Sequence, residues 1–442
     1  MWAHPSACVI GAEEPPMRRQ VVSTPPRSRR SVGPTRGIRR SAIVSAVAGA
    51  LLLSACAADT DPDRSVTIEG ADASLIRATV EESIAQTGAQ AVIVRVMRGD
   101  EVLLTQAWGE SMTGVPATVD MHFRNGAVAI PQVATVLLQL VDEGVVSLDD
   151  RLSTWLPDVP FADEVELGQL AQMTSGYADY LWSDEFRDGF FADPFRQWTP
   201  DELVAMATAQ PHVYPPGTNW NYAHTNYVLL GLALEEIMGR PLDQLIQERI
   251  LDPLGMTETA DPGTPELLQP ALHAYDSERR PALGIPDGVP FVEESTSWNP
   301  SWSLARGAIQ NSDITDTATV IRAVGRGDLL SDESHALQIA PTLRGTTTAV
   351  DGCPSCLEQN EAYTYGYGIV LSGDWLIQNP LFHGYAGVAA YLPTEDLTIA
   401  VAATYGDESF DEDGQPRGNI AMTIFRDLAA VLAPDHPVPS RS

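Results

Sequence analysis

Lysine is absent from this chain: all 27 basic residues among its 442 are arginines. The absence excludes every mechanism that needs a lysine amine, whether a Schiff base, a pyridoxal-phosphate linkage, a P-loop lysine or a lysine general base. Basic residues are also outnumbered by 59 acidic ones, which gives a formal net charge of −32. A surface of that sign repels phosphate backbones and anionic lipids, so no nucleic-acid partner is expected.

The apolar segment near the N-terminus is short. Residues 41–55 hold 15 uncharged residues, too few to span a bilayer comfortably. Eight arginines lie between residues 18 and 40, and a basic region before a short apolar one is typical of a secretory signal. Leu53-Ser54-Ala55-Cys56 resembles a bacterial lipobox, in which the cysteine is lipidated and becomes the first mature residue.

We therefore expect residues 1–55 to be a signal peptide that starts at Met1 or Met17. The mature protein is expected outside the cell, attached to the outer face of the cytoplasmic membrane by the lipid on Cys56 alone. The alternative is a plain signal peptide followed by a coincidental cysteine.

The chain has few cysteines and lacks the sequence patterns typical of metal ligands. Cys353 and Cys356 form a C-P-S-C in a Gly/Thr/Ser-rich loop, without the helix start of a redox motif or the second ligand pair of a zinc site. Export favours oxidation, so these two cysteines are expected to form a local disulfide. The eight histidines are scattered, with no H-E-x-x-H or similar spacing. We expect no metal site and no cofactor.

The pattern of the remaining chain predicts an acidic spacer (56–66), one domain (67–435) and a Pro-rich tail (436–442). Helical spacing begins the domain, and strand patterns stand near both of its ends with mostly helical patterns between them. One sheet assembled from both ends, with an inserted helical region, is the expected architecture. The expected helices and strands are a helix within 67–87, two strands within 91–110, strands near 365–373, 385–393 and 397–406, and a last helix within 419–433.

Residues 121–157, MHFRNGAVAIPQVATVLLQLVDEGVVSLDDRLSTWLP, resemble the nucleophile region of the serine β-lactamase and D-Ala-D-Ala carboxypeptidase family. The likeness is greatest to the class C type and its esterase and penicillin-binding-protein-like relatives. It continues through 167–180, 215–242 and 250–259 to the last strands. The resemblance implies an α/β (α+β) fold of the β-lactamase/transpeptidase type, with an antiparallel sheet and an all-helical region.

Members of that family work by three motifs, and this chain departs from each. The serine and lysine of S-x-x-K fall on Ala127 and Ile130. The tyrosine of Y-x-N is retained as Tyr222, but its asparagine is replaced by His224. The third motif, H-x-G or K-T-G, falls on Gln378-Asn379-Pro380.

His383 is an alternative for the histidine of the third motif, but this placement needs a deletion and leaves Tyr385 where glycine is needed. Pro131 adds a physical argument about the first motif. A proline beyond the first helical turn clashes with the carbonyl four residues earlier, so the helix should begin near Ile130 or Pro131 and not at Ala127.

These substitutions predict a catalytically inactive family member, kept for binding or structural work. It would hold a small-molecule or peptidoglycan-like ligand in a remnant cleft, or a protein partner. The alternative is an active serine-type hydrolase, acting as a carboxypeptidase, esterase or β-lactamase, that uses other groups such as Ser175 or His224. Open polar pockets favour a ligand, whereas a site filled by side chains favours an interaction or structural role.

Overall fold

A computed structural model describes residues 70–286, 288–411 and 414–440. The expected signal peptide, Cys56 and the acidic spacer lie outside the described residues. Within the described part of the chain, no helix is both long and apolar enough to cross a membrane.

A twisted antiparallel sheet forms the centre of the fold, in the order β3-β2-β1-β13-β12-β10-β9-β8, with β11 also paired to β12. Both ends of the domain contribute to it, because β1 pairs with β13 along its whole length. The strands are β1 (Ala89–Arg98), β2 (Glu101–Met112), β3 (Val115–Pro116), β8 (Thr364–Tyr365), β9 (Val370–Ser372), β10 (Trp375–Gln378), β11 (Leu381–Phe382), β12 (Tyr385–Leu392) and β13 (Leu397–Tyr405).

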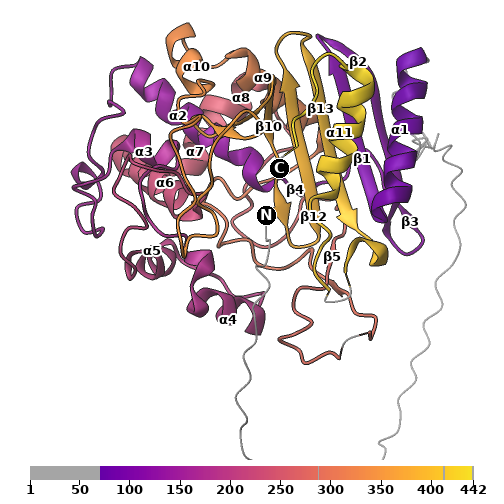
Figure 1. The fold of residues 1–442 in the computed structure, drawn as a ribbon, viewed down its shortest axis with the longest axis horizontal. Coiled ribbons are helices and arrows are strands. Elements are labelled where there is room, and N and C mark those ends of the chain that lie inside the picture. The colour runs from indigo at the N-terminus through magenta and orange to yellow at the C-terminus, as the bar shows by residue number, and fades with distance from the viewer. Residues whose placement is uncertain (1–69, 287, 412–413, 441–442) are drawn as a thin grey trace, which may run out of the picture. The chain divides into compact units, whose positions relative to one another are not determined.

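Helices cover both faces of this sheet. The first and last of them, α1 (Ala71–Thr87) and α11 (Ile420–Leu432), pack together on one face, and α9 (Ile314–Arg326) packs against β1, β12 and β13 from the other (Figure 1). These elements agree with the predicted helices at both ends of the domain. The tight turn at Gly99, where φ is 58°, joins β1 to β2, the two strands predicted within 91–110.

A second region, mostly helical, lies beside the sheet (Figure 1). Its helices are α2 (Ile130–Asp142), α3 (Leu167–Ala171), α4 (Asp184–Ala192), α5 (Pro200–Thr208), α6 (His224–Met238), α7 (Leu242–Ile246), η4 (Gln247–Leu251), α8 (Asp252–Leu254) and α10 (Asp332–Gln338). Short strand pairs join β4 (Phe123–Arg124) to β7 (Asn311–Ser312) and β5 (Tyr275–Asp276) to β6 (Glu293–Glu294). The predicted fold class, an antiparallel sheet built from both ends plus an all-helical region, is confirmed.

Pro131 sets where α2 begins. The α-helix starts at Ile130, and the four residues before it, Gly126–Ala129, form a separate 3₁₀ turn, η1. A proline in the first turn loses no helical hydrogen bond, whereas deeper in a helix it would clash with the preceding turn. The predicted helix start is therefore confirmed, and Ala127 lies outside the α-helix.

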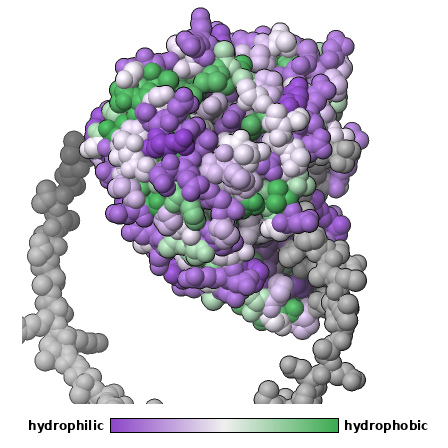
Figure 2. Space-filling view, turned by 60° about the vertical axis from the view of Figure 1, so that its left-hand side comes forward, coloured by the Kyte–Doolittle hydropathy of each residue, from purple (hydrophilic) through white to green (hydrophobic). Residues whose placement is uncertain are grey.

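The visible surface is largely hydrophilic. On the face shown in Figure 2, hydrophilic residues predominate and hydrophobic ones form smaller groups between them.

Candidate functional site

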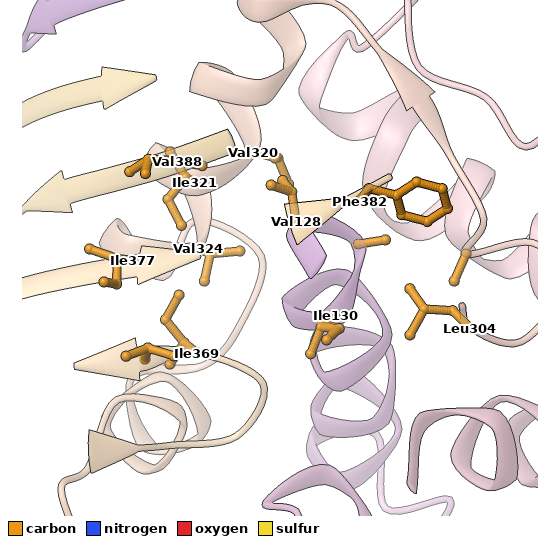
Figure 3. Packing of buried hydrophobic residues seen from close by; sticks show 14 of the residues in the cluster. Val128, Ile130, Leu304, Val320, Ile321, Val324, Ile369, Ile377, Phe382 and Val388 are labelled. Carbon is orange, nitrogen blue, oxygen red and sulfur yellow. The ribbon is translucent and has the colours of Figure 1, made fainter. Parts of the chain in front are cut away.

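The turn that would carry a nucleophile carries hydrocarbon. Ala127 lies half-buried in η1, and Ile130 is only 1% exposed at the first residue of α2. Figure 3 shows Val128, Leu304 and Phe382 gathered around this helix start. All three are buried in the same hydrophobic core. Covalent acyl transfer in this family requires a side-chain oxygen at the first position and a basic amine at the second. Ala127 and Ile130 supply neither group.

The backbone of this turn is nevertheless held firmly. Arg124, just before it, is buried and donates through Nη2 to the carbonyl oxygens of Pro265, Thr296 and Trp298 at 2.6, 3.0 and 3.2 Å. Burial lowers the pKa of Arg124 to about 10, so the guanidinium remains charged at neutral pH. Charge-assisted hydrogen bonds of this kind are strong. The scaffold around the first motif is thus held in place, although Ala127 and Ile130 stand at its serine and lysine positions.

Tyr222 and His224 lie together just before and at the start of α6. Their rings meet edge to face with centroids 5.4 Å apart, and both residues are half-buried. His224 Nδ1 lies 3.0 Å from Oδ2 of Asp179, a carboxylate that is 3% exposed. Burial, together with Tyr363 and Asp179, raises the pKa of the Tyr222 hydroxyl well above its ordinary value. Tyr222 therefore stays a neutral phenol at neutral pH and is no ready proton acceptor.

The third motif is engaged within the fold. Gln378 is 1% exposed and donates from Nε2 to the Gly368 carbonyl at 2.6 Å. Asn419 donates from Nδ2 to the carbonyls of Asn379 and Pro380 at 3.2 and 3.1 Å. The Gln378 amide nitrogen and these two carbonyls thus already have hydrogen-bond partners inside the fold.

Pro380 also brings the third motif close to the first. A Cβ added to Gly126 would lie 3.0 Å from Cβ of Pro380, and β11 packs against η1. The structure therefore places the positions of the first and third motifs side by side, as the family resemblance implies.

The loop that holds Cys353 and Cys356 lies against the second motif. The two cysteines form a disulfide, and Cys356 bridges to Asn221 in an antiparallel pairing. The backbone N–H of Tyr222 donates to the Ser355 carbonyl at 3.4 Å. The disulfide loop thus supports the backbone that presents Tyr222.

Ser175 and His383 have structural surroundings. The Ser175 hydroxyl is fully buried and donates to Oδ1 of Asn226 at 2.5 Å, so the ordinary structural turn is the interpretation that its environment supports. His383 turns toward Asp276 and Glu278, with its ring stacked on Phe190 at 4.5 Å.

Sequence reasoning missed Asp179, Leu304 and Phe382. Asp179 lies 45 residues before His224 in the chain, and no local pattern marks it as that histidine's partner. Leu304 and Phe382 lie in loop or short-strand segments that carry no periodic pattern. Their contact with the start of α2 exists only in the folded chain.

Comparison with known proteins agrees with this geometry. The β-lactamase family profile matches residues 76–421. Penicillin-binding protein 4 of Amycolatopsis lactamdurans is 33% identical over 155 residues, which cover 33% of this chain and 38% of that protein. Esterase EstB of Burkholderia gladioli is 27% identical over 218 residues, covering 46% of this chain and 55% of the esterase. The chain thus spans about half or less of the length of these curated relatives.

Among solved structures, a D-stereospecific amidohydrolase from Streptomyces sp. superimposes with a TM-score of 0.64. It is 25% identical, and the match covers 81% of this chain and 98% of the amidohydrolase. The profile match, the relatives and the shared fold all indicate the same family. The chain belongs to the β-lactamase family of serine hydrolases, a family that includes penicillin-binding proteins and their esterase and D-aminopeptidase relatives.

Proposed function

We propose that this chain is a non-hydrolysing member of its family, kept for binding or structural work at the cell envelope. The observation that carries the proposal is the pair Ala127 and Ile130, an alanine and a buried isoleucine where acyl transfer needs a serine and a lysine. Since the chain has no lysine, no other residue can supply the missing amine.

The contacts of the remaining motif residues favour a protein-interaction or structural role over capture of a peptidoglycan-like ligand. Gln378 and the carbonyls of Asn379 and Pro380 are hydrogen-bonded inside the fold. Phe382 and Leu304 fill the space around the start of α2 with carbon. A small-molecule site usually offers several converging polar groups that are free to orient a ligand.

The proposal includes attachment to the membrane by a lipid on Cys56 and no other membrane contact. It rests on the basic and apolar segments before Cys56 and on the lipobox-like Leu53-Ser54-Ala55. The acidic spacer 56–66 would separate the domain from the membrane surface.

One observation favours a second candidate function. In the Asp179–His224 pair the carboxylate lies against Nδ1 of the imidazole. A carboxylate in this position orients the ring and leaves Nε2 to act as a base. Such a base would activate water directly, because no serine in this site takes the place of Ala127. The second candidate is therefore a hydrolase that forms no covalent intermediate.

Intact-protein mass spectrometry of the full chain after incubation with a penicillin or an activated ester separates these functions. We expect no added acyl mass and ester turnover close to the uncatalysed rate, since only oriented binding remains. His224→Ala and Tyr222→Phe should leave that background rate unchanged. An acyl adduct on any serine would overturn the proposal, whereas hydrolysis without an adduct that disappears in His224→Ala would establish the second function.

A further inference from the structure

Three side chains that could bind a metal ion converge beside the third motif but outside the positions assigned to the three motifs. Asp276 is in β5, Glu278 follows two residues later, and His383 lies between β11 and β12. Their nearest ligand atoms all lie within 4.8 Å of one another. The side chains of Asp276, Glu278 and His383 are 3%, 10% and 9% exposed, so the cluster is nearly closed to bulk solvent.

The spacing fits a transition metal. His383 Nδ1 lies 3.0 Å from Oε2 of Glu278 and 3.6 Å from Oδ2 of Asp276. Ligands about 2.0–2.2 Å from a tetrahedral zinc ion are separated from each other by about 3.4 Å. One imidazole and two carboxylates also match the ligand types of zinc sites that keep a fourth position for water.

The imidazole is already oriented. Its ring stacks on Phe190 with centroids 4.5 Å apart, and the Trp298 and Trp302 rings lie at 5.2 and 5.5 Å. The backbone N–H of Glu278 donates to Oδ1 of Asp276 at 2.6 Å, which leaves Oδ2 to face His383. A metal would therefore meet side chains that are held in place beforehand, a condition for tight binding.

The cluster has an excess of negative charge. Among the described residues, the ion pairs of Asp276 and Glu278 are with His383 alone. The nearby Arg279 is paired with Glu293 at 2.8 Å and also donates to the Phe191 carbonyl.

A third carboxylate, that of Glu293, lies near Asp276, and one of its oxygens has no hydrogen-bond partner among the described residues. Glu293 stands directly across from Asp276 in the β5–β6 pair, and its Oε1 is buried with no hydrogen-bond partner among the described residues. Buried polar atoms are normally paired, so an orphaned carboxylate oxygen indicates that a cation or water belongs nearby.

From this geometry we propose that Asp276, Glu278 and His383 bind a divalent metal ion of the zinc class. The inference goes beyond the proposed function, because it does not depend on whether Ala127 and Ile130 support hydrolysis. It also departs from the expectation of no metal site, which rested on the absence of closely spaced ligand motifs. The ion would join the β5–β6 pair to the β11–β12 hairpin, whose preceding residue Pro380 packs over Gly126.

The competing occupant is a proton. Burial alone would lower the pKa of His383, but Asp276 and Glu278 outweigh it and raise the pKa to about 9. Metal binding at Nδ1 releases that proton to solvent and leaves the imidazole neutral, with both carboxylates ionised.

Zinc titration of the purified full chain, treated first with a chelator, tests the proposal by calorimetry. We expect one zinc ion per chain, and at least tenfold weaker binding in His383→Gln and in Glu278→Gln. His436→Gln is the matched control, because His436 pairs with the single carboxylate of Asp374 on the surface. This control should bind zinc within about twofold of the wild type.

X-ray absorption at the zinc edge of the wild-type protein keeps the test independent of variants that fail to fold. One imidazole nitrogen and oxygen ligands at about 2.0–2.2 Å are expected. Zinc bound without imidazole scattering would place the ion on surface carboxylates and overturn the proposal. So would a wild type that binds no zinc, or a folded His383→Gln that binds as the wild type does.

Discussion

Replacing Ile130 with lysine examines the apolar surroundings of the first motif. Ile130 is 1% exposed. In an active relative a serine and an asparagine would face the lysine amine, and their positions here hold Ala127 and His224. A lysine has an unperturbed pKa of about 10.4, and a unit of pKa shift corresponds to about 1.4 kcal/mol. Holding the amine neutral at pH 7 in this environment therefore costs about 4–5 kcal/mol.

We expect Ile130→Lys to lose about that amount of unfolding free energy, a large part of the total of about 5–15 kcal/mol typical of folded domains. Chemical denaturation followed by tryptophan fluorescence measures it as a lower midpoint at unchanged slope. Ile130→Met is the control, because it keeps hydrocarbon of similar volume and should cost less than about 1.5 kcal/mol.

The combined variant Ala127→Ser with Ile130→Lys should remain unreactive toward a fluorescent penicillin. The restored serine would stand in the 3₁₀ turn before α2, because Pro131 sets the helix start at Ile130. It would face His224, and Gln378 of the third motif is already hydrogen-bonded to the Gly368 carbonyl. Equal denaturation midpoints for Ile130→Lys and Ile130→Met would refute the account of an apolar, unpartnered site. Labelling of the double variant would show that the geometry for acyl transfer survives.

Three further predictions concern other parts of the chain. Cys56→Ser should move the protein from the membrane fraction to the soluble fraction; a wild type that is already soluble contradicts lipidation. Cys353 and Cys356 should resist alkylation in denatured protein until they are reduced. Because the disulfide loop is short, Cys356→Ser should lower the free energy of unfolding by at most about 2 kcal/mol. Burial and the charge of Asp313 raise the pKa of Asp316 from 3.8 to about 6. Its stabilising contribution is therefore present below about pH 4 and lost as pH rises through 6. Denaturation at several pH values should therefore show that Asp316→Asn has a free energy of unfolding up to about 2 kcal/mol above that of the wild type when the pH exceeds 6, after allowance for solvent screening. Near pH 4 the two proteins should be equally stable.

Local patterns were sufficient to predict much of the fold. The strand pattern within 91–110 predicted β1 and β2, and Pro131 predicted the start of α2. Both signals arise from steric rules that act within a few residues. The family assignment likewise followed from long matched segments.

The environment of the site could not be predicted in the same way. The contact between His224 and Asp179 joins residues 45 apart, and that between His383 and Glu278 joins residues 105 apart. Tertiary folding creates these pairs, and a single sequence carries no periodic or spacing signal for them. The residues at positions 127 and 130 could be read from the chain, but the packing of Leu304 and Phe382 near Ile130 could not.

The pairing of β1 with β13 also bears on when this protein can fold. Residues 89–98 acquire a neighbour on one side only after 397–405 have been synthesised, and long-range pairing of this kind forms slowly. The sheet therefore cannot close on a nascent chain that lacks its last fifty residues. Premature termination before β13 would leave β1 as an open edge prone to aggregation.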